Sequence, residues 1–142
     1  MLNLCVKIYT GEKMFSKLGI YLYVFLIGAT LYSTIEVVFR GYTHWTMTLT
    51  GGVIFTLIYL MNKYIKTRSL TIRCLISCSI ITAIEFVVGV IVNIIFKMNV
   101  WDYSNQPLNL FGQICLVFTA AWFIISVPAC YLAIFIKEKL DP

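Results

Sequence analysis

Four long apolar segments are the feature that most constrains how this chain can fold. They cover about residues 18–39, 46–62, 74–96 and 114–136. A helix rises about 1.5 Å per residue, so segments of this kind can cross roughly 30 Å of hydrocarbon. The second segment is short, and we expect Trp45 at one membrane interface and the Lys63 side chain extending to the other. The sequence therefore predicts an all-α bundle of four transmembrane helices, forming a single transmembrane domain over residues 1–142.

Composition excludes a water-soluble fold. The chain is 61% hydrophobic and 12% charged, whereas soluble domains are roughly half apolar and a quarter charged. The first apolar segment is too long for the hydrophobic region of a signal peptide and has no convincing cleavage site, so we read it as a spanning helix. The net charge of +5 is expected to reflect membrane orientation, with no nucleic-acid partner.

The distribution of basic residues predicts the orientation. Nine lie in the amino-terminal segment, the middle loop and the carboxyl tail: Lys7, Lys13, Lys17, Lys63, Lys66, Arg68, Arg73, Lys137 and Lys139. The opposite side has only Arg40 and Lys97. The positive-inside rule therefore places both termini and the middle loop in the cytoplasm of a cell membrane.

The five cysteines predict neither a disulfide framework nor a metal site. Their number is odd, and most of them lie within or at the ends of apolar segments. Cys74 and Cys78 share a helix face, but no histidine or third thiol stands nearby to complete a tetrahedral site. We therefore expect small buried side chains, with no metal and no cofactor.

A weak internal repeat connects the two halves of the chain. An Ile-Glu pair at Glu36 is followed by Trp45 and two glycines, and an Ile-Glu pair at Glu85 is followed by Trp101 and Gly112. Two helices separate the copies, so they would have the same orientation, as in a parallel repeat. Chance similarity between apolar helices is an equally good explanation.

Glu85 is the most informative single residue, because it lies near the middle of the third segment. A charged carboxylate facing lipid there costs at least a few kcal/mol, so the side chain should face the bundle interior. Gly89 and Asn93 follow on roughly the same helix face. A hydrogen-bonded glutamate that only holds helices together is as probable as a functional one.

A second candidate cluster follows the first segment. Glu36 precedes Arg40 by one helical turn, a spacing that allows an ion pair, and His44 and Trp45 come next. An arginine beside aromatic residues at the membrane surface suits a phosphate or carboxylate group. An ordinary interfacial anchor is the alternative.

The loop before the fourth segment holds the third cluster, with Trp101, Asp102, Tyr103 and Asn109. Asp102 suits a cap or a turn, and Gly112 suits close packing at the start of the fourth helix. Asp102 and Arg40 lie on the same side of the membrane, so we also predict that they pair and close the outer mouth of the bundle.

The motifs WDYSNQPLNLFGQICL, IEVVFRGYTHWTMTLTGG and IEFVVGVIVN resemble the bacterial CmpB-like family of ABC-transporter type IV permeases. The resemblance extends over about residues 20–126. The residues at the motif positions are Glu36, Arg40, Gly41, His44, Trp45, Glu85, Gly89, Trp101, Asp102, Tyr103, Pro107, Asn109 and Gly112. It implies a permease-like component of a transport system in a bacterial membrane.

The sequence contains no G-x-x-x-x-G-K-[ST] motif. ATP hydrolysis would therefore come from a separate nucleotide-binding subunit. Besides the lipid bilayer, we expect a second copy or another membrane chain as partner, because four helices enclose little volume.

Two other functions remain open. A non-catalytic accessory or scaffold protein would use the polar residues only for helix packing, and it is as probable as a permease. An enzyme acting on a lipid could use Glu85 or Glu36 as general acid or base. We rank it lower, because no nucleophile stands beside an evident base.

Overall fold

The computed structural model describes the backbone of residues 2–67 and 69–140, and the side chains of residues 17–67 and 69–140. Its helices are α1 (Leu2–Arg40), α2 (Trp45–Tyr64), α3 (Leu70–Gly89), a π-helix (Val90–Ile95) that continues α3, and α4 (Leu116–Leu140). Two short strands, β1 (Asn109–Leu110) and β2 (Ile114–Cys115), precede α4. The side chains of Cys5, Lys7, Lys13 and Arg68, which enter the sequence predictions, lie outside the described residues.

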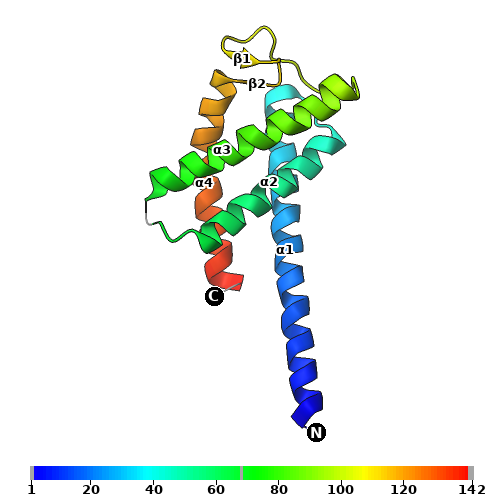
Figure 1. Cartoon of the computed structure of the whole chain (residues 1–142), viewed down its shortest axis with the longest axis vertical. Helices are drawn as coiled ribbons and strands as arrows, with labels where there is room; N and C mark the ends of the chain where they lie inside the picture. The colour runs from blue at the N-terminus through cyan, green and yellow to red at the C-terminus, as the bar shows by residue number, and fades with distance from the viewer. Residues whose placement is uncertain (1, 68, 141–142) are drawn as a thin grey trace.

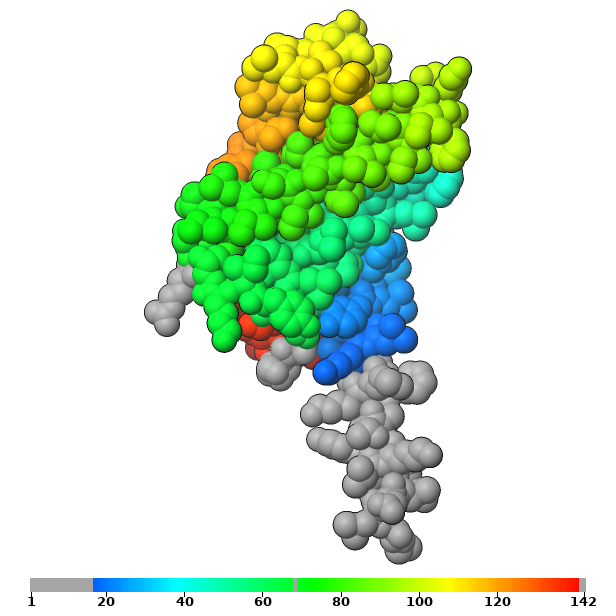
Figure 2. All heavy atoms as spheres, in the orientation of Figure 1, coloured from blue at the N-terminus to red at the C-terminus, as the bar shows by residue number. Residues whose placement is uncertain are grey.

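The helices form two layers (Figure 1). α2 and α3 run obliquely across one face, and in the space-filling view they cover most of it (Figure 2). α1 and α4 stand behind them and run in opposite directions. α1 packs mainly on α2 and α4 mainly on α3, and α2 also contacts both α3 and α4. Few backbone positions of α1 and α4 come close together, and these two helices meet through side chains.

Four helical segments are long and apolar enough to cross a membrane: Lys17–Arg40, Trp45–Tyr64, Leu70–Ile95 and Leu116–Leu140. The predicted four-helix membrane bundle is thus confirmed, and the chain is a multi-pass membrane protein. The structure gives the short second span 20 residues, which is sufficient for about 30 Å of hydrocarbon. Large apolar side chains such as Val38 and Phe39, each 75% exposed, cover the outer surface, as lipid contact requires.

The start of the fourth span differs from the prediction. We expected the helix to begin near Ile114, but Ile114 and Cys115 form β2, which pairs antiparallel with β1, and α4 begins at Leu116. Phe111 and Gly112 adopt left-handed backbone conformations between the two strands. This turn brings Ile114 and Cys115 alongside Asn109 and Leu110, and the strand pairing holds them in extended conformation, so the helix begins two residues later.

Close contact between α1 and α2 depends on two glycines. A Cβ atom added to Gly51 would overlap the Cβ of Tyr32, and one added to Gly28 would overlap the Cβ of Phe55. Small residues that let helix backbones approach are common in membrane bundles, where helices associate by packing rather than by the hydrophobic effect. This contact fixes the position of Tyr32, which takes part in the candidate site.

The internal repeat stays a prediction. The strongest packing is within the pairs α1–α2 and α3–α4, as two helical hairpins would give. However, Glu36 lies one turn before the end of α1, whereas Glu85 lies well inside the segment formed by α3 and the π-helix. The two glutamates are therefore not at equivalent depths.

The topology yields a first prediction. The start of α1, the end of α4 and the loop between α2 and α3 lie toward one end of the bundle, and the hairpin formed by β1 and β2 lies at the other (Figure 1). Cysteines introduced at the exposed Ser69 and Asn105, with the five native cysteines replaced, should label differently in intact cells. An impermeant maleimide should label Asn105→Cys alone, and labelling of Ser69→Cys alone would reverse the orientation.

The glycine contact yields a second prediction. Gly51→Ala should destabilise the protein by about 1–3 kcal/mol, the usual cost of overpacking, because the added methyl group meets Tyr32. Gly19→Ala is the matched control, since a Cβ atom at Gly19 meets nothing within 4 Å. Thermal unfolding in detergent should separate the two variants, and equal melting temperatures would show that α1 and α2 are not in close contact.

Candidate functional site

Glu85 on α3 is the centre of a hydrogen-bonded group inside the bundle. Its side chain is only 5% exposed, which confirms that it faces the interior. The hydroxyl of Tyr32 on α1 donates to Oε1 at 2.5 Å, and the indole Nε1 of Trp122 on α4 donates to Oε2 at 2.7 Å. The Tyr32 and Trp122 rings stack with centroids 5.4 Å apart. One carboxyl group thus connects three helices.

Glu36 and Arg40 form the predicted ion pair near the C-terminal end of α1. Nη1 of Arg40 lies 2.7 Å from Oε1 of Glu36, and Glu36 is 6% exposed. The hydroxyl of Thr43 donates to the other carboxylate oxygen at 2.6 Å. Both oxygens of the buried Glu36 are therefore satisfied, as a carboxylate in hydrocarbon requires.

Arg40 also connects α1 to the long loop between the π-helix and β1, residues 96–108. Its Nη2 donates to the hydroxyl of Tyr42 and to the carbonyl oxygen of Val100. The amide N–H of Val100 in turn donates to Oδ1 of Asn93 at 2.7 Å. The backbone of Val100 therefore bridges Arg40 on α1 and Asn93 in the π-helix.

A second group of hydrogen bonds lies beside this bridge and centres on Gln113. Asn93 Nδ2 donates to the side-chain oxygen of Gln113 at 2.8 Å, and Trp101 Nε1 donates to the backbone carbonyl oxygen of Gln113 at 2.9 Å. A Cβ atom at Gly89 would come within 2.6 Å of the Gln113 side-chain oxygen and 2.9 Å of the Trp101 ring. Glycine at this position thus allows the loop to pack directly on α3.

The predicted pair of Asp102 with Arg40 is wrong. The Asp102 carboxylate is exposed and accepts hydrogen bonds from the amide and the hydroxyl of Ser104. These two bonds hold the pKa of Asp102 below its usual value. The residue acts as a turn former, the alternative we had considered, while the Val100 carbonyl takes the place expected for its carboxylate.

Asn109 and Tyr103 complete the loop. Asn109 Nδ2 donates to the carbonyl oxygens of Ser104 and Gln106, so its role is to hold the turn before β1. Tyr103 is partly buried, and its ring stacks on Phe118 of α4 with centroids 4.5 Å apart. Burial raises the pKa of its hydroxyl, and the negative charge of Glu85 adds to this effect.

His44 and Trp45 lie apart from this network. Nδ1 of His44 accepts a hydrogen bond from the Thr46 amide at 3.4 Å and so caps the start of α2. Trp45 is 62% exposed and contacts the imidazole ring. Their positions fit a helix cap and an interfacial anchor, which was the alternative interpretation.

Two adjoining cavities lie between α1 and α4. The larger, of about 380 Å³, is lined almost entirely by apolar side chains of α1, α2 and α4. The smaller, of about 140 Å³, lies toward the hairpin end and includes Glu36, Arg40 and Tyr103 in its wall. The two cavities share four lining residues: Tyr32, Ile35, Trp122 and Ile125.

The described cysteines, and the polar residues at the end of the bundle away from the hairpin, serve packing. Cys74, Cys78, Cys115 and Cys130 are buried free thiols, and Cys130 contacts Ser77 at 3.3 Å. Arg73 donates to Oδ1 of Asn62 at 2.6 Å. Within the described residues, no group of three or more His, Cys, Asp or Glu side chains could hold a metal ion.

The sequence analysis identified the charged residues of the site but missed their hydrogen-bond partners. Glu85 is bonded by Tyr32 and Trp122. Glu36 is bonded by Thr43 as well as Arg40, and Asn93 donates to Gln113. A buried carboxylate implies donors, and Tyr and Trp combine an apolar ring with one donor. The chain has nine tyrosines, so the type of partner could have been predicted but not its position.

The corrected contacts of Arg40 yield a third prediction. A double-mutant cycle of Glu36→Gln with Arg40→Gln should show a coupling of about 0.5–3 kcal/mol in the free energy of unfolding, as expected for residues in contact. The matched cycle of Asp102→Asn with Arg40→Gln should be additive. Chemical unfolding in mixed micelles measures both cycles, and coupling in the second would restore the Asp102–Arg40 pair.

Comparison with known proteins identifies the family of the chain. No curated protein matches the chain, and no solved structure matches it. The family model described as "Putative ABC-transporter type IV" matches residues 14–140. That range contains all four spanning segments, both buried glutamates and the whole outer loop. The chain therefore belongs to this ABC-transporter-related family of membrane proteins.

Proposed function

We propose that this protein is the permease-like membrane component of a transport system. The supporting observation is the position of Glu85. Its carboxyl group, together with Tyr32 and Trp122, lies inside the membrane-spanning part of the bundle, and those two side chains line both cavities between α1 and α4. A polar group at this depth beside accessible volume is typical of a substrate or ion pathway.

The packing of the helices supports the same proposal. α1 and α4 flank the cavities, and their contact is made by side chains, chiefly the stacked rings of Tyr32 and Trp122, because few of their backbone positions come close together. A change in their separation would open or close the cavities if this stack were released and α2 shifted against α3 and α4, while the α1–α2 and α3–α4 interfaces stayed intact. Such movement of one helix pair against another is how membrane transporters commonly alternate access.

The proposal includes an arrangement in the cell. The protein lies in the cell membrane with both termini in the cytoplasm, as the distribution of basic residues predicts. A separate nucleotide-binding subunit supplies ATP hydrolysis, and it docks on the cytoplasmic side. A second copy of this chain or another membrane chain completes the pathway, since four helices enclose too little space for one alone.

Substitution of Glu85 tests the proposal, which is our fourth prediction. Glu85→Gln keeps the size of the side chain and cannot ionise; its oxygen can still accept from Trp122 Nε1, and its NH2 group can donate to the Tyr32 hydroxyl, which can also accept. Glu85→Leu removes the polar group. In cells lacking the native gene, we expect Glu85→Gln to reach normal membrane levels and yet fail to restore the phenotype that the wild-type gene restores. Glu138→Gln, at an exposed position in the last turns of α4, is the matched control and should restore it.

The alternative function predicts a different result. In a scaffold protein, Glu85 would serve only to hold helices together, and glutamine would replace it without loss. Full complementation by Glu85→Gln, with Glu85→Leu alone disrupting assembly, would therefore reject the permease proposal and support the scaffold.

A further inference from the structure

The hairpin formed by β1 and β2 exposes large apolar side chains. Leu108 is 78% exposed and Phe111 is 72% exposed, and Leu110 between them is exposed as well. These three residues form the apolar tip of the hairpin. The chain has no charged residue between Asp102 and Lys137, so no charge holds the tip in water. Exposed apolar patches of this kind mark contacts with a membrane or with another protein.

The backbone at the tip is unusual for the residues that occupy it. Leu108 and Phe111 have left-handed conformations, with φ of 53° and 51°. Glycine and asparagine are the usual residues at such positions, because bulky side chains are disfavoured there. The chain instead places there two side chains that have no hydrogen-bonding group and leaves both largely exposed. Backbone outliers of this kind indicate a function for the residue.

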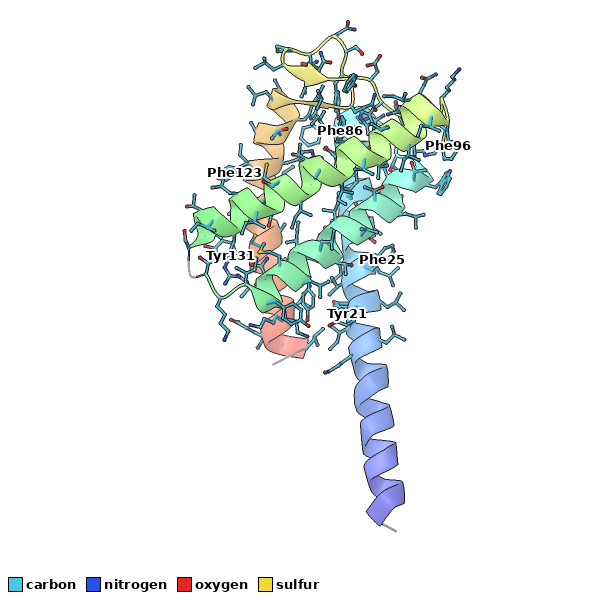
Figure 3. All side chains as sticks on the ribbon, viewed as in Figure 1. Tyr21, Phe25, Phe86, Phe96, Phe123 and Tyr131 are labelled. Carbon is cyan, nitrogen blue, oxygen red and sulfur yellow. The ribbon has the colours of Figure 1, made fainter. Side chains whose placement is uncertain are left out.

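The apolar tip lies beside a part of α3 that is inside its membrane span. The rings of Phe111 and Phe86 have centroids 6.4 Å apart. Leu110 borders the same surface hollow as Thr82 and Phe86 of α3. Both α3 residues lie well within the spanning segment Leu70–Ile95, and Figure 3 shows Phe86 on α3 below the hairpin. The tip is therefore close to a surface that faces lipid.

The hairpin also continues directly into the fourth span. β2 ends at Cys115 and α4 begins at Leu116. Leu116 and Val117 are exposed apolar residues in the first turn of α4. The tip thus extends, without an intervening charge, the lipid contact that the spanning helix α4 already requires.

Hydrogen bonds inside the hairpin prepare its backbone for lipid. A segment that leaves water must have its backbone polar groups bonded internally. The Gln113 N–H donates to the carbonyl oxygen of Leu110, and its side-chain Nε2 donates to that of Phe111. Asn109 Nδ2 donates to two carbonyl oxygens across the turn, and its Oδ1 accepts from the Gly112 N–H. The carbonyl groups of two tip residues are therefore bonded without water.

We propose that the apolar tip inserts into the lipid interface at the hairpin end of the bundle, while the polar turn at residues 104–106 stays in water. The partner is the bilayer surface. Because the hairpin has no charge, its insertion does not depend on the charge of the lipid head groups. The inference is independent of the permease function and holds for a scaffold protein as well.

Spin labelling measures the environment of the tip. Leu108→Cys and Phe111→Cys are made one at a time in the full-length protein with its five native cysteines replaced, and each carries a nitroxide label in phosphatidylcholine nanodiscs. Collisions with oxygen, which concentrates in lipid, are compared with collisions with a water-soluble nickel chelate. Asn105→Cys is the control in water, and Phe135→Cys, exposed on α4, is the control in lipid.

We expect the ratio of oxygen to nickel collisions at both tip positions to be at least threefold higher than at Asn105→Cys. The corresponding depth is about 5–10 Å into the boundary between head groups and acyl chains. A ratio equal to that of Asn105→Cys would place the tip in water, and low collision rates with both reagents would show that protein covers it. Either result overturns the proposal, as does insertion that occurs only in phosphatidylglycerol.

A substitution at Leu108 tests the role of the apolar side chain. Leu108→Asn suits the left-handed backbone, so the hairpin can still fold, but the tip becomes polar. With the label at Phe111→Cys, we expect the collision ratio to fall at least twofold. Gln106→Asn, in the polar turn, is the matched control and should leave the ratio unchanged. Equal ratios in the two variants would reject the apolar tip as the inserted element.

Photolabelling of the wild-type protein does not depend on the folding of a variant. A phospholipid with a diazirine near the start of one acyl chain should label the tip at Leu108 and Phe111, and should leave residues 104–106 unlabelled. Labelling of the spanning helices without the tip would overturn the proposal. The Glu85 complementation test is unaffected by any of these outcomes.

Discussion

The carboxyl group of Glu85 is the constraint on which the rest of the bundle depends. A carboxylate inside hydrocarbon must be hydrogen-bonded, and here its two oxygens receive donors from Tyr32 on α1 and Trp122 on α4. Three helices must therefore hold fixed positions around one residue. The α1–α2 contact through Gly28 and Gly51 contributes directly, because it holds the backbone of α1 where Tyr32 can reach α3.

At the hairpin end of the bundle, backbone groups are also hydrogen-bonded to side chains of neighbouring helices. The Val100 peptide accepts a hydrogen bond from Arg40 and donates one to Asn93, while Gln113 joins Asn93 to Trp101. These bonds connect the loop to α1 and to the π-helix. Between α1 and α4 few backbone positions come close together; the stacked rings of Tyr32 and Trp122 bridge the two helices, and both cavities lie there with these rings in their walls. The helix contacts thus determine where a ligand could enter.

The sequence predicted contacts correctly where they depend on neighbouring positions of one helix, or where exposure of a group to lipid is energetically excluded. The Glu36–Arg40 pair follows from helical spacing, and burial of Glu85 follows from the cost of a charge in lipid. It failed for the Asp102–Arg40 pair, because being on the same side of the membrane does not fix a distance. Asp102 has a nearer partner in Ser104, and local bonds of this kind compete effectively with distant ones.

The sequence by itself determined the number of spanning helices, the membrane class and the burial of Glu85, because hydrocarbon imposes length and polarity limits that each segment meets alone. Only the tertiary structure decided that Tyr32, Trp122 and Gln113 are the hydrogen-bond partners, that β2 replaces the expected first turn of α4, and that the cavities lie between α1 and α4. The chain offers several chemically equivalent partners for each polar group. Helix packing, which sums many weak contacts across the whole bundle, selects among them.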